Sequence, residues 1–560
     1  MAESIGVATG NEETLVRKTY TAILSALFIL AGMGAASAAP STGSLGIGSL
    51  GSGSIDSGSV GSFWGSLAPD DEQSYDEVDP ASGTLIADSG FRVDRDGFKY
   101  RNWGAPSAEH PRGLTPELMQ SLYGDKVCAR VVTGECALSA TGQALQADLN
   151  DFLTGGHCYG FAAASGQFET GVIAKSDYLR PATTVFENDP TDKLDGLISR
   201  YASTQFSSPT TDGTVRYSVS ETLDRLTAAW GQDENYILSV FGTVGGHAIT
   251  PIALRDLGNG KTGIVVYDNN FPGVEKMVVA DRAANTWYYT ALLNPSTPAY
   301  LFVGSPANQM ELSELKPSAQ PQECPTCVDG DESVLVLVKD NAENPDGTMI
   351  DWDFDVQAPG GGAIDGLESR PLVNTQKAAL FSVPAEKAFE IKLKGAPAGL
   401  TADIDISLYG DGWVNEIDNI ALQPGSRATV GVDQSQRKLT LSGTTVFEPL
   451  LMLAAEQANW SVSTGGADLR LQPGTTLSVE RDADGDVVYG LAGLGAPASM
   501  LIAVKRSDSV GDQVVSTNDP VAIPVNAEAS IAANGWNGAS PLTVRVVGAG
   551  VDESYPMSPR

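Results

Sequence analysis

Residues 155–165 read GGHCYGFAAAS, and this stretch decides the fold expected for the first half of the chain. Two glycines and a histidine precede Cys158, and a run of small apolar residues follows it. The run predicts a buried helix that packs closely against a sheet, with Cys158 in its first turn. The positive end of a helix dipole lowers the pKa of a thiol in that place and favours the thiolate. Cys158 is therefore the candidate nucleophile.

Two later stretches supply groups that would activate a thiol. His247 follows two glycines in residues 245–250, which read GGHAIT and predict a strand. A second expected strand, residues 265–267, ends in Asp268 and two asparagines. A thiol, an imidazole and an orienting carboxylate or amide are the groups that cysteine nucleophiles use, here in the order Cys, His, Asp or Asn.

The pairing of these two strands bears on which residue orients His247. An Asn-Gly turn between them would place Asp268 and Asn270 on the His247 face and Asn269 on the other face. Regular pairing brings Asn270 nearer to His247. Pro251 cannot donate a ladder hydrogen bond and indicates a bulge, which would shift the register toward Asp268. Asp268 is the favoured third member, with Asn270 in reserve.

A cysteine that opens a helix, followed by His and then Asp or Asn on successive strands, resembles the arrangement of papain-like cysteine peptidases, and most closely their bacterial secreted members. The resemblance rests on GGHC, GGH and YDNN and covers roughly residues 85–310. It implies an α+β papain-like domain in which Asp268 is the third catalytic group. It also implies a protein, peptide or wall-peptide substrate, and such chemistry requires no metal or organic cofactor.

The oxyanion of such a reaction needs hydrogen-bond donors. The backbone N–H of Cys158 is one natural donor. Papain-like enzymes add a glutamine shortly upstream, and this chain has none close before Cys158. The nearest amides are Asn150, Gln146 and Gln143, and Asn150 is the oxyanion candidate. His157 is expected to line the cleft or to hydrogen-bond the loop, because its place in the sequence turns it away from Cys158.

The cysteine count also singles out Cys158. Five cysteines in a secreted chain leave one unpaired when the others form disulfides. Cys128 and Cys136 flank a short segment that can turn back on itself, and they make one expected disulfide. Cys324 and Cys327, in ECPTC, make the other, with half of a zinc site or a redox pair as the alternatives.

Charge and the N-terminal sequence indicate where the protein works. The net charge of −34 would repel nucleic acid and anionic membranes, which excludes nucleic acid as a partner. Arg17 and Lys18 precede an apolar run and an Ala-Ser-Ala site, which is typical of a cleavable secretory signal over residues 1–38, with an uncleaved anchor as the alternative. The mature protein is expected to be secreted, extracellular and free of the membrane after cleavage.

The remaining chain divides by composition. Residues 39–83 are a Gly/Ser-rich and then acidic linker, 84–312 the expected hydrolase domain, and 313–330 a linker with prolines and cysteines. Short strand-like runs between turn residues then predict an all-β region. We expect one β-sandwich over 331–445 and a second sandwich, or a continuation of the first, over 446–560.

Local signals predict further elements of the hydrolase domain. Helices are expected from Thr115, over residues 141–153 and over residues 220–230. Alternation and turn residues predict a hairpin over residues 91–104 that lines the cleft or edges the sheet. His110, in a loop with prolines, is expected at the surface.

These observations favour a secreted papain-like cysteine hydrolase that cleaves amide or peptide bonds through Cys158, His247 and Asp268. The alternative is an extracellular binding or adhesion protein, in which the β-sandwich region does the work and the cysteine-peptidase-like domain is inactive. Accessibility and reactivity of the Cys158 thiol distinguish the two hypotheses.

Overall fold

The computed structural model of the chain describes residues 75–107, 109–110, 113–230, 232, 234–242, 245–292, 299–328, 332–340, 352–370, 378–396, 399–433, 437–457, 460–481, 486–493, 496–508, 511–533, 536–538 and 540–559. The expected signal peptide at 1–38 and most of the linker at 39–83 lie outside the described residues. No helix in the described part of the chain is long and apolar enough to cross a bilayer.

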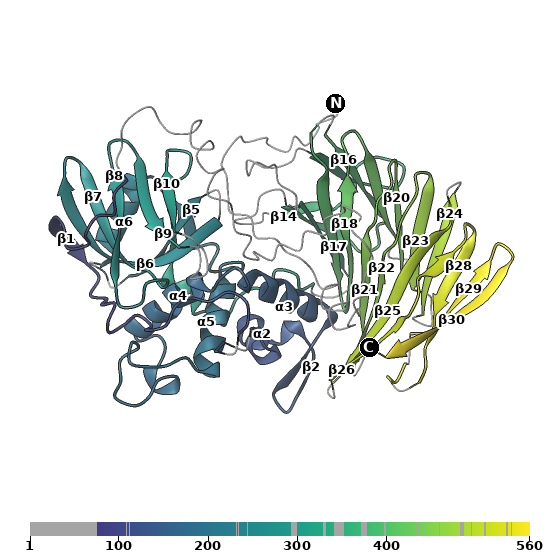
Figure 1. Cartoon of the computed structure of the whole chain (residues 1–560), viewed down its shortest axis with the longest axis horizontal. Helices are drawn as coiled ribbons and strands as arrows, with labels where there is room; N and C mark the ends of the chain where they lie inside the picture. The colour runs from purple at the N-terminus through teal and green to yellow at the C-terminus, as the bar shows by residue number, and fades with distance from the viewer. Residues whose placement is uncertain are drawn as a thin grey trace, which may run out of the picture.

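The described residues before position 329 form an α+β region, as expected from the sequence (Figure 1). Its helices are α2 (Pro116–Tyr123), α3 (Ala140–Leu153), α4 (Cys158–Glu169), α5 (Asp192–Thr204), α6 (Val219–Trp230) and α7 (Leu315–Ser318), with 3₁₀ turns η2 (Gly124–Val127) and η3 (Lys175–Asp177). The hydroxyl of Thr115 caps α2 by accepting a hydrogen bond from Leu118 N, and Pro116 occupies the first turn. The three helices expected from the sequence are therefore confirmed, with ends that differ by at most a residue or two.

The strands of this region form a nine-stranded antiparallel sheet. Its strands are β1 (Thr84–Asp88), β4 (Thr214–Arg216), β5 (Tyr236–Gly242), β6 (Gly245–Gly258), β7 (Lys261–Tyr267), β8 (Glu275–Asp281), β9 (Thr286–Ala291), β10 (Tyr300–Gly304) and β11 (Glu311–Glu314). The order is β10-β9-β8-β7-β6-β5-β11-β4, with β1 on the far half of β6. Its apolar core includes the buried face of α6. The sheet therefore carries His247 on β6 and Asp268 just after β7.

The β6–β7 hairpin has the turn and the bulge that its sequence indicates. Asn259 and Gly260 both have positive φ, at 52° and 77°, as a tight Asn-Gly turn requires. The register shifts between Pro251 and Ala253. By contrast, the expected hairpin over residues 91–104 is wrong, because the described backbone there forms turns and irregular segments. Hydrogen bonds across short turns, such as Asp96 N to Arg92 O, replace a strand ladder there.

The helix that begins at Cys158 is held on both sides. All of α4 from Cys158 to Phe168 is buried, and it packs against α5 and β6. A Cβ atom at Gly160 would lie 2.0 Å from the carbonyl oxygen of Ile198 in α5, so only glycine permits this approach. The small residues read from the sequence thus bring α4 close to its neighbours.

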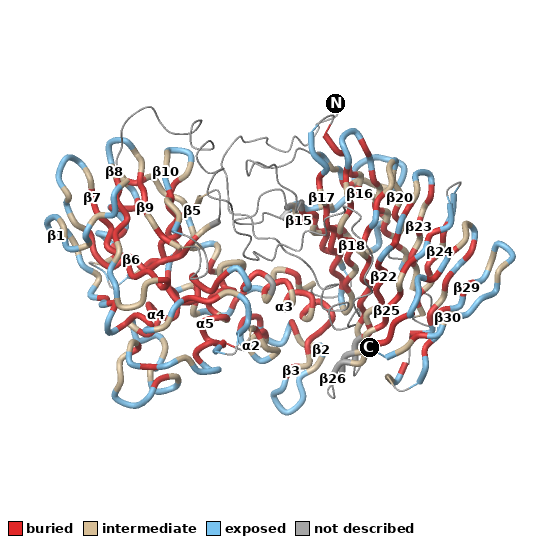
Figure 2. Tube along the Cα trace, viewed as in Figure 1, coloured by how far each residue is buried: buried red, intermediate tan, exposed pale blue. Residues whose placement is uncertain are grey.

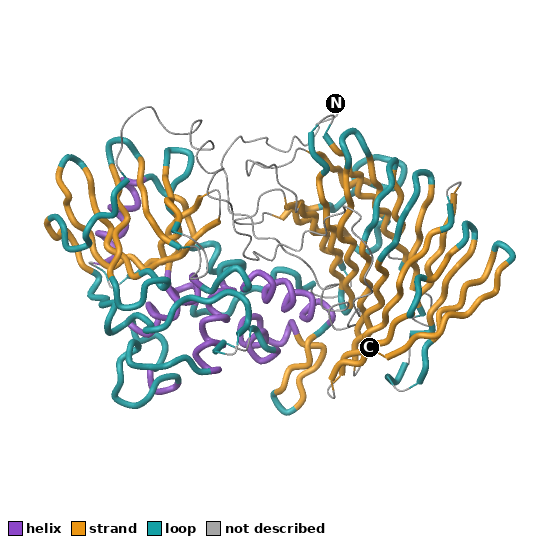
Figure 3. The backbone as a smooth tube through the Cα atoms, in the orientation of Figure 1, coloured by secondary structure: helices purple, strands orange, loops and turns teal. Residues whose placement is uncertain are grey.

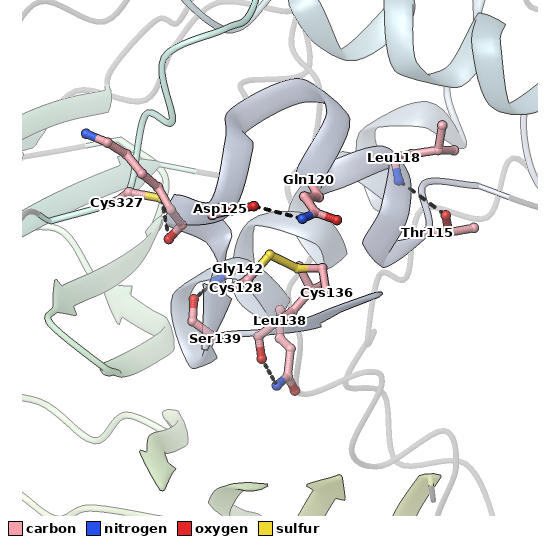
Figure 4. Close-up of a disulfide and its surroundings, with 12 residues drawn as sticks. Thr115, Leu118, Gln120, Asp125, Cys128, Cys136, Leu138, Ser139, Gly142 and Cys327 are labelled. Carbon is pink, nitrogen blue, oxygen red and sulfur yellow. Dashed lines mark hydrogen bonds between the residues drawn. A yellow bond between two sulfur atoms is a disulfide. The ribbon is translucent and has the colours of Figure 1, made fainter. Parts of the chain in front are cut away.

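Both expected disulfides are present. Cys128 and Cys136 join β2 (Cys128–Val132) to β3 (Glu135–Leu138), and Cys324 pairs with Cys327. Figure 4 shows the first disulfide with Cys327 nearby, where its sulfur lies 3.6 Å from the carbonyl oxygen of Lys126. Cys158 is the free cysteine.

The described residues from position 333 onward form an all-β region of antiparallel strands, which make two long ladders joined at the last strand (Figure 3). Its strands are β12 (Ser333–Asp340), β13 (Trp352–Gln357), β14 (Glu368–Arg370), β15 (Ala378–Pro384), β16 (Phe389–Gly395), β17 (Ala402–Gly410), β18 (Trp413–Leu422), β19 (Arg427–Asp433), β20 (Lys438–Gly443), β21 (Leu450–Gln457), β22 (Trp460–Ala467), β23 (Thr475–Arg481), β24 (Val487–Gly493), β25 (Ala498–Asp508), β26 (Gly511–Thr517), β27 (Val521–Ile523), β28 (Ala527–Ile531), β29 (Thr543–Gly548) and β30 (Val551–Pro559).

Successive hairpins alternate between the two sheets. The pairs β17–β18, β21–β22 and β25–β26 lie side by side in one sheet, and β19–β20, β23–β24 and β28–β29 lie side by side in the other. One apolar core runs between the sheets from Val334 to Met557. The strand pairing and the apolar core therefore run without a break past residue 445.

Helix α3 joins the two regions. Ala140 and Ala144, one turn apart, pack on the outer face of one sheet among residues of β12, β17, β18 and β21. Figure 2 shows α3 between the α+β region and the β region, with buried residues along the contact. The last residue of α3, Leu153, precedes Cys158 by five positions, so the segment before the nucleophile starts from a helix seated on the β region.

Buried charged groups lie beside this contact. Asp148 is one turn beyond Ala144 on α3, and Lys339 lies directly opposite Asp405 in the β12–β17 pairing. Burial and the neighbouring carboxylates raise the pKa of Glu416 well above its usual range, although Lys339 opposes the shift. Oε2 of Glu416 is buried and has no hydrogen-bond partner among the described residues. The cluster therefore favours a protonated Glu416.

Replacement of Glu416 by glutamine should make the protein more stable at neutral and alkaline pH. A carboxyl group whose folded pKa is raised stabilises the fold below its ordinary pKa of 4.5, and this contribution is lost as the pH rises toward the folded value. Urea unfolding should show that the free energy of unfolding falls more between about pH 5 and about pH 8 in the wild type than in Glu416→Gln. Glu528→Gln, at an exposed position, is the control, and equal drops in all three proteins would contradict the prediction.

Candidate active site

The candidate nucleophile lies where the sequence places it, at the first residue of α4. Cys158 is 9% exposed, and His157 occupies the N-cap position without a side-chain cap. The first N–H groups of a helix have no partner within the helix, and they bring the positive end of its dipole to this thiol. Cys158 is thus buried, in a setting that favours the thiolate.

His247 and Asp268 form a fully buried pair. Nε2 of His247 lies 2.8 Å from Oδ1 of Asp268, and both side chains are shielded from solvent. The other ring nitrogen, Nδ1, makes no hydrogen bond of ordinary geometry among the described residues. Cys158 is nevertheless close enough to His247 to raise its pKa. Because Asp268 occupies Nε2, Nδ1 is the nitrogen that can exchange a proton with Cys158.

The charges of the pair reinforce one another. Burial lowers the pKa of His247. Asp268 and Cys158 raise this pKa by more than burial lowers it, so the net pKa is about 10. Burial raises the pKa of Asp268, but His247 and the hydroxyl of Tyr289 lower it, and the net result is a lowered value. An imidazolium between a carboxylate and a thiolate is the arrangement that these shifts favour.

Asp268 is held by a full set of donors. Its Oδ1 accepts a second hydrogen bond from Asn270 N at 2.8 Å, and its Oδ2 accepts one from the hydroxyl of Tyr289 at 2.6 Å. The reserve residue Asn270 also lies beside the ring, with Nδ2 at 3.4 Å from His247 Nε2, and Nδ2 donates to the carbonyl of Leu292 at 2.8 Å. The shorter contact identifies Asp268 as the direct partner of His247.

Asn269 holds the two halves of the site together. Its Nδ2 donates to the carbonyl oxygens of Cys158 at 3.1 Å and of Ala248 at 2.9 Å. The start of α4 is thereby fixed against the residue that follows His247. This contact sets the distance between nucleophile and base.

The amide of Asn150, the oxyanion candidate, makes its described hydrogen bonds to Leu114. Its Oδ1 accepts a hydrogen bond from Leu114 N at 2.7 Å, and its Nδ2 donates to Leu114 O at 3.3 Å. Both ends of the amide are therefore engaged in holding the segment before α2. The structure gives Asn150 no hydrogen bond to Cys158 among the described contacts.

Asn102 is the amide that lies beside the start of α4. Its Oδ1 accepts a hydrogen bond from His157 N at 2.7 Å, while its Nδ2 is buried and has no hydrogen-bond partner among the described residues. Gly156 has a φ of 144°, and a Cβ atom there would lie 3.3 Å from this Nδ2. An unsatisfied buried donor is costly, so the free N–H groups of Asn102 indicate a position for an acceptor next to the nucleophile.

Two histidines outside the His247 pair surround Trp103. His157 hydrogen-bonds the Trp103 carbonyl through Nδ1 at 2.8 Å, in agreement with the expected loop contact. The expectation for His110 is wrong, because this residue is 7% exposed and its Nδ1 lies 3.0 Å from Oδ2 of Asp195. Both imidazole rings stack on the indole of Trp103.

The signals for these additional residues in the sequence are weak. Asn102 and Trp103 belong to the stretch that was assigned to the cleft or to a sheet edge, and neither carries a recognisable spacing to Cys158. Tyr289 lies in an ordinary strand pattern, TWYYTA, in which a tyrosine that donates to a buried carboxylate cannot be told from a core residue. Only the fold shows these partners.

No protein-family model matches the chain, and comparisons with curated proteins and with solved structures give no match. Within the described residues there is no group of three or more His, Cys, Asp or Glu side chains that could hold a metal ion.

Removal of the Asp268 carboxylate should make the thiolate harder to form. Asp268→Asn removes the charge that raises the pKa of His247, so the imidazolium that stabilises a Cys158 thiolate becomes less favourable. The acid limb of iodoacetamide alkylation at Cys158 should move to higher pH by about one unit or more. Asp256→Asn on the same strand as His247, at an exposed carboxylate, is the control, and identical profiles in the two variants would contradict this assignment.

Proposed function

We propose that this protein is a secreted cysteine hydrolase of the papain-like type, which cleaves amide or peptide bonds through Cys158, His247 and Asp268. The observation that carries the proposal is the buried His247–Asp268 hydrogen bond of 2.8 Å beside a free cysteine at a helix N-terminus. A nucleophile, a base and an orienting group in contact are the parts that covalent acyl transfer needs.

The first half of the proposed reaction forms an acyl-enzyme. The Cys158 proton passes to His247, and the thiolate attacks the amide carbonyl carbon, so that a C–S bond forms and the carbonyl electrons move to oxygen. The Cys158 N–H and Nδ2 of Asn102 are the proposed donors to this oxyanion. The imidazolium then protonates the amide nitrogen, the C–N bond breaks and the amine leaves a thioester on Cys158.

The second half releases the acyl group. His247, now neutral, takes a proton from water, and the hydroxide attacks the thioester carbonyl. The C–S bond breaks, the proton returns to sulfur and a carboxylic acid leaves. Asp268 stays ionised throughout, orients the ring through Nε2 and stabilises its positive charge.

Secretion and the substrate class belong to the same proposal. Two disulfides are typical of proteins that mature in oxidising compartments. The substrate is proposed to be a protein, a peptide or a wall peptide, and a transglutaminase-like acyl transfer would use the same thioester. No step calls on a metal or an organic cofactor.

A second candidate is an extracellular binding or adhesion protein whose working part is the β region. The continuous sandwich from position 333 to 559 and the near-complete burial of Cys158 favour it. In that case the thiol would be inert and the α+β region would serve as a scaffold.

Iodoacetamide labelling of the non-reduced protein, followed by peptide mapping, decides between the candidates. The hydrolase predicts rapid modification of Cys158 below neutral pH and its loss in His247→Ala, because the variant lacks the imidazolium that stabilises the thiolate. Cys158→Ala should also abolish turnover of a peptide library. A folded protein whose Cys158 resists labelling at every pH would favour the binding protein.

The assignment of Asn102 predicts a separate effect on turnover. Asn102→Asp keeps an oxygen for His157 N but removes the N–H donors, so turnover should fall by about 10²- to 10³-fold, as for other oxyanion donors. The alkylation rate of Cys158 should change far less, because that reaction forms no oxyanion on a carbonyl. Asn150→Asp is the matched control, and equal losses in both variants would remove Asn102 from the site.

A further inference from the structure

Trp103 is clamped between two imidazole rings. The ring centroids of Trp103 and His110 are 4.0 Å apart with an interplanar angle of 3°, and those of Trp103 and His157 are 4.4 Å apart at 26°. The indole also meets Phe161 of α4 edge to face at 5.2 Å. All four side chains are buried, so both faces and one edge of the indole are fixed.

The backbone next to this indole touches both halves of the proposed site. The Trp103 carbonyl accepts hydrogen bonds from His157 N at 3.1 Å and from the ring of His157 at 2.8 Å. On the other side, Asn102 N donates to Asn269 O at 3.0 Å. The Asn102–Trp103 dipeptide therefore spans the segment before Cys158 and the loop after β7.

This dipeptide lies outside any helix or strand, so its place depends on its contacts. The His110 end of the stack is held by Asp195, with Nδ1 to Oδ2 at 3.0 Å. Asp195 belongs to α5, which packs directly against α4 through Gly160. The stack thus connects the dipeptide to the same helix that supports the nucleophile.

The buried position beside Trp103 is occupied by a polar pair, His110 and Asp195. A buried carboxylate with an imidazole is costly to desolvate, and an apolar residue would fill the same space at lower cost. One hydrogen bond to Nδ1 fixes the plane of the His110 ring, and the nearly parallel stack passes that orientation to the indole. Tyr100, whose ring lies 5.9 Å from that of His110, is the other titratable neighbour in described contact with it.

We propose that His110 and Asp195 are positioning residues, which act through the Trp103 stack to hold the Asn102 amide in register for acyl transfer. The inference rests on the proposed function and extends it to a hydrogen-bonded pair remote from the reacting atoms. Loss of the pair should let the dipeptide shift, so that the Asn102 N–H groups leave the oxyanion position while the thiol and His247 remain in place.

The test compares three readouts in the full-length secreted protein. These are kcat and KM for a cleaved peptide, the affinity of the matching peptide aldehyde, and the iodoacetamide alkylation rate of Cys158. The aldehyde is chosen because its adduct with Cys158 bears an oxyanion-like oxygen. In Asp195→Ala and His110→Ala, kcat and aldehyde affinity should fall together by about 10- to 100-fold, the loss expected for a displacement near 1 Å. KM and the alkylation rate should stay within about threefold of the wild type.

Conservative variants separate positioning from stability. Asp195→Asn keeps an acceptor for Nδ1, so it should restore most of kcat, whereas His110→Phe keeps the stack without the hydrogen bond and should show an intermediate loss. Tyr123→Phe removes a buried hydrogen bond to Ser207 elsewhere in the α+β region and is the control for lost stability alone. If the alanine variants do not fold, Asp195→Asn and His110→Phe provide the test.

Two results would overturn the inference. If all folded His110 and Asp195 variants keep the kcat and the aldehyde affinity of the wild type, the pair has only a structural role. Equal falls in kcat and in alkylation rate would also overturn it, since the pair would then act on the nucleophile itself. A wild type without turnover and without Cys158 labelling would overturn the proposed function and, with it, this extension.

Discussion

The hydrogen bond between His247 and Asp268 is the constraint on which the rest of the α+β region depends. Two groups that prefer water are buried together, and their hydrogen bond of 2.8 Å favours the charged form of each. The hydroxyl of Tyr289 and the backbone N–H of Asn270 also donate hydrogen bonds to the Asp268 carboxylate. Asn269 connects the adjacent backbone to the carbonyl of Cys158. A small movement of either strand would therefore cost hydrogen bonds as well as packing.

Much of this region follows from local sequence signals. Thr115 and Pro116 indicate the start of a helix. The Asn-Gly turn predicts the β6–β7 hairpin, and Pro251 predicts the bulge at which the register shifts. Cysteine parity identifies Cys158 as the free thiol. These features are visible because each depends on residues that are close together in the chain.

The features that sequence reasoning missed depend on distant residues. Asn102 reaches His157 from 55 positions upstream, and His110 finds Asp195 85 positions downstream. An isolated histidine between prolines resembles a surface residue, since the carboxylate that stabilises its burial lies on another helix. Asn150 was favoured as the oxyanion donor by its nearness in the sequence, but α3 directs its amide to Leu114 instead.

The seating of α3 on the outer sheet bears on how such a protein can change through evolution. The stripe of Ala140 and Ala144 fits one particular sheet face, and Asp148 meets the buried charges beneath it. A β region exchanged for an unrelated one would expose that stripe and leave the carboxylate without Lys339. An exchange of the β region would therefore succeed only with matching changes on α3.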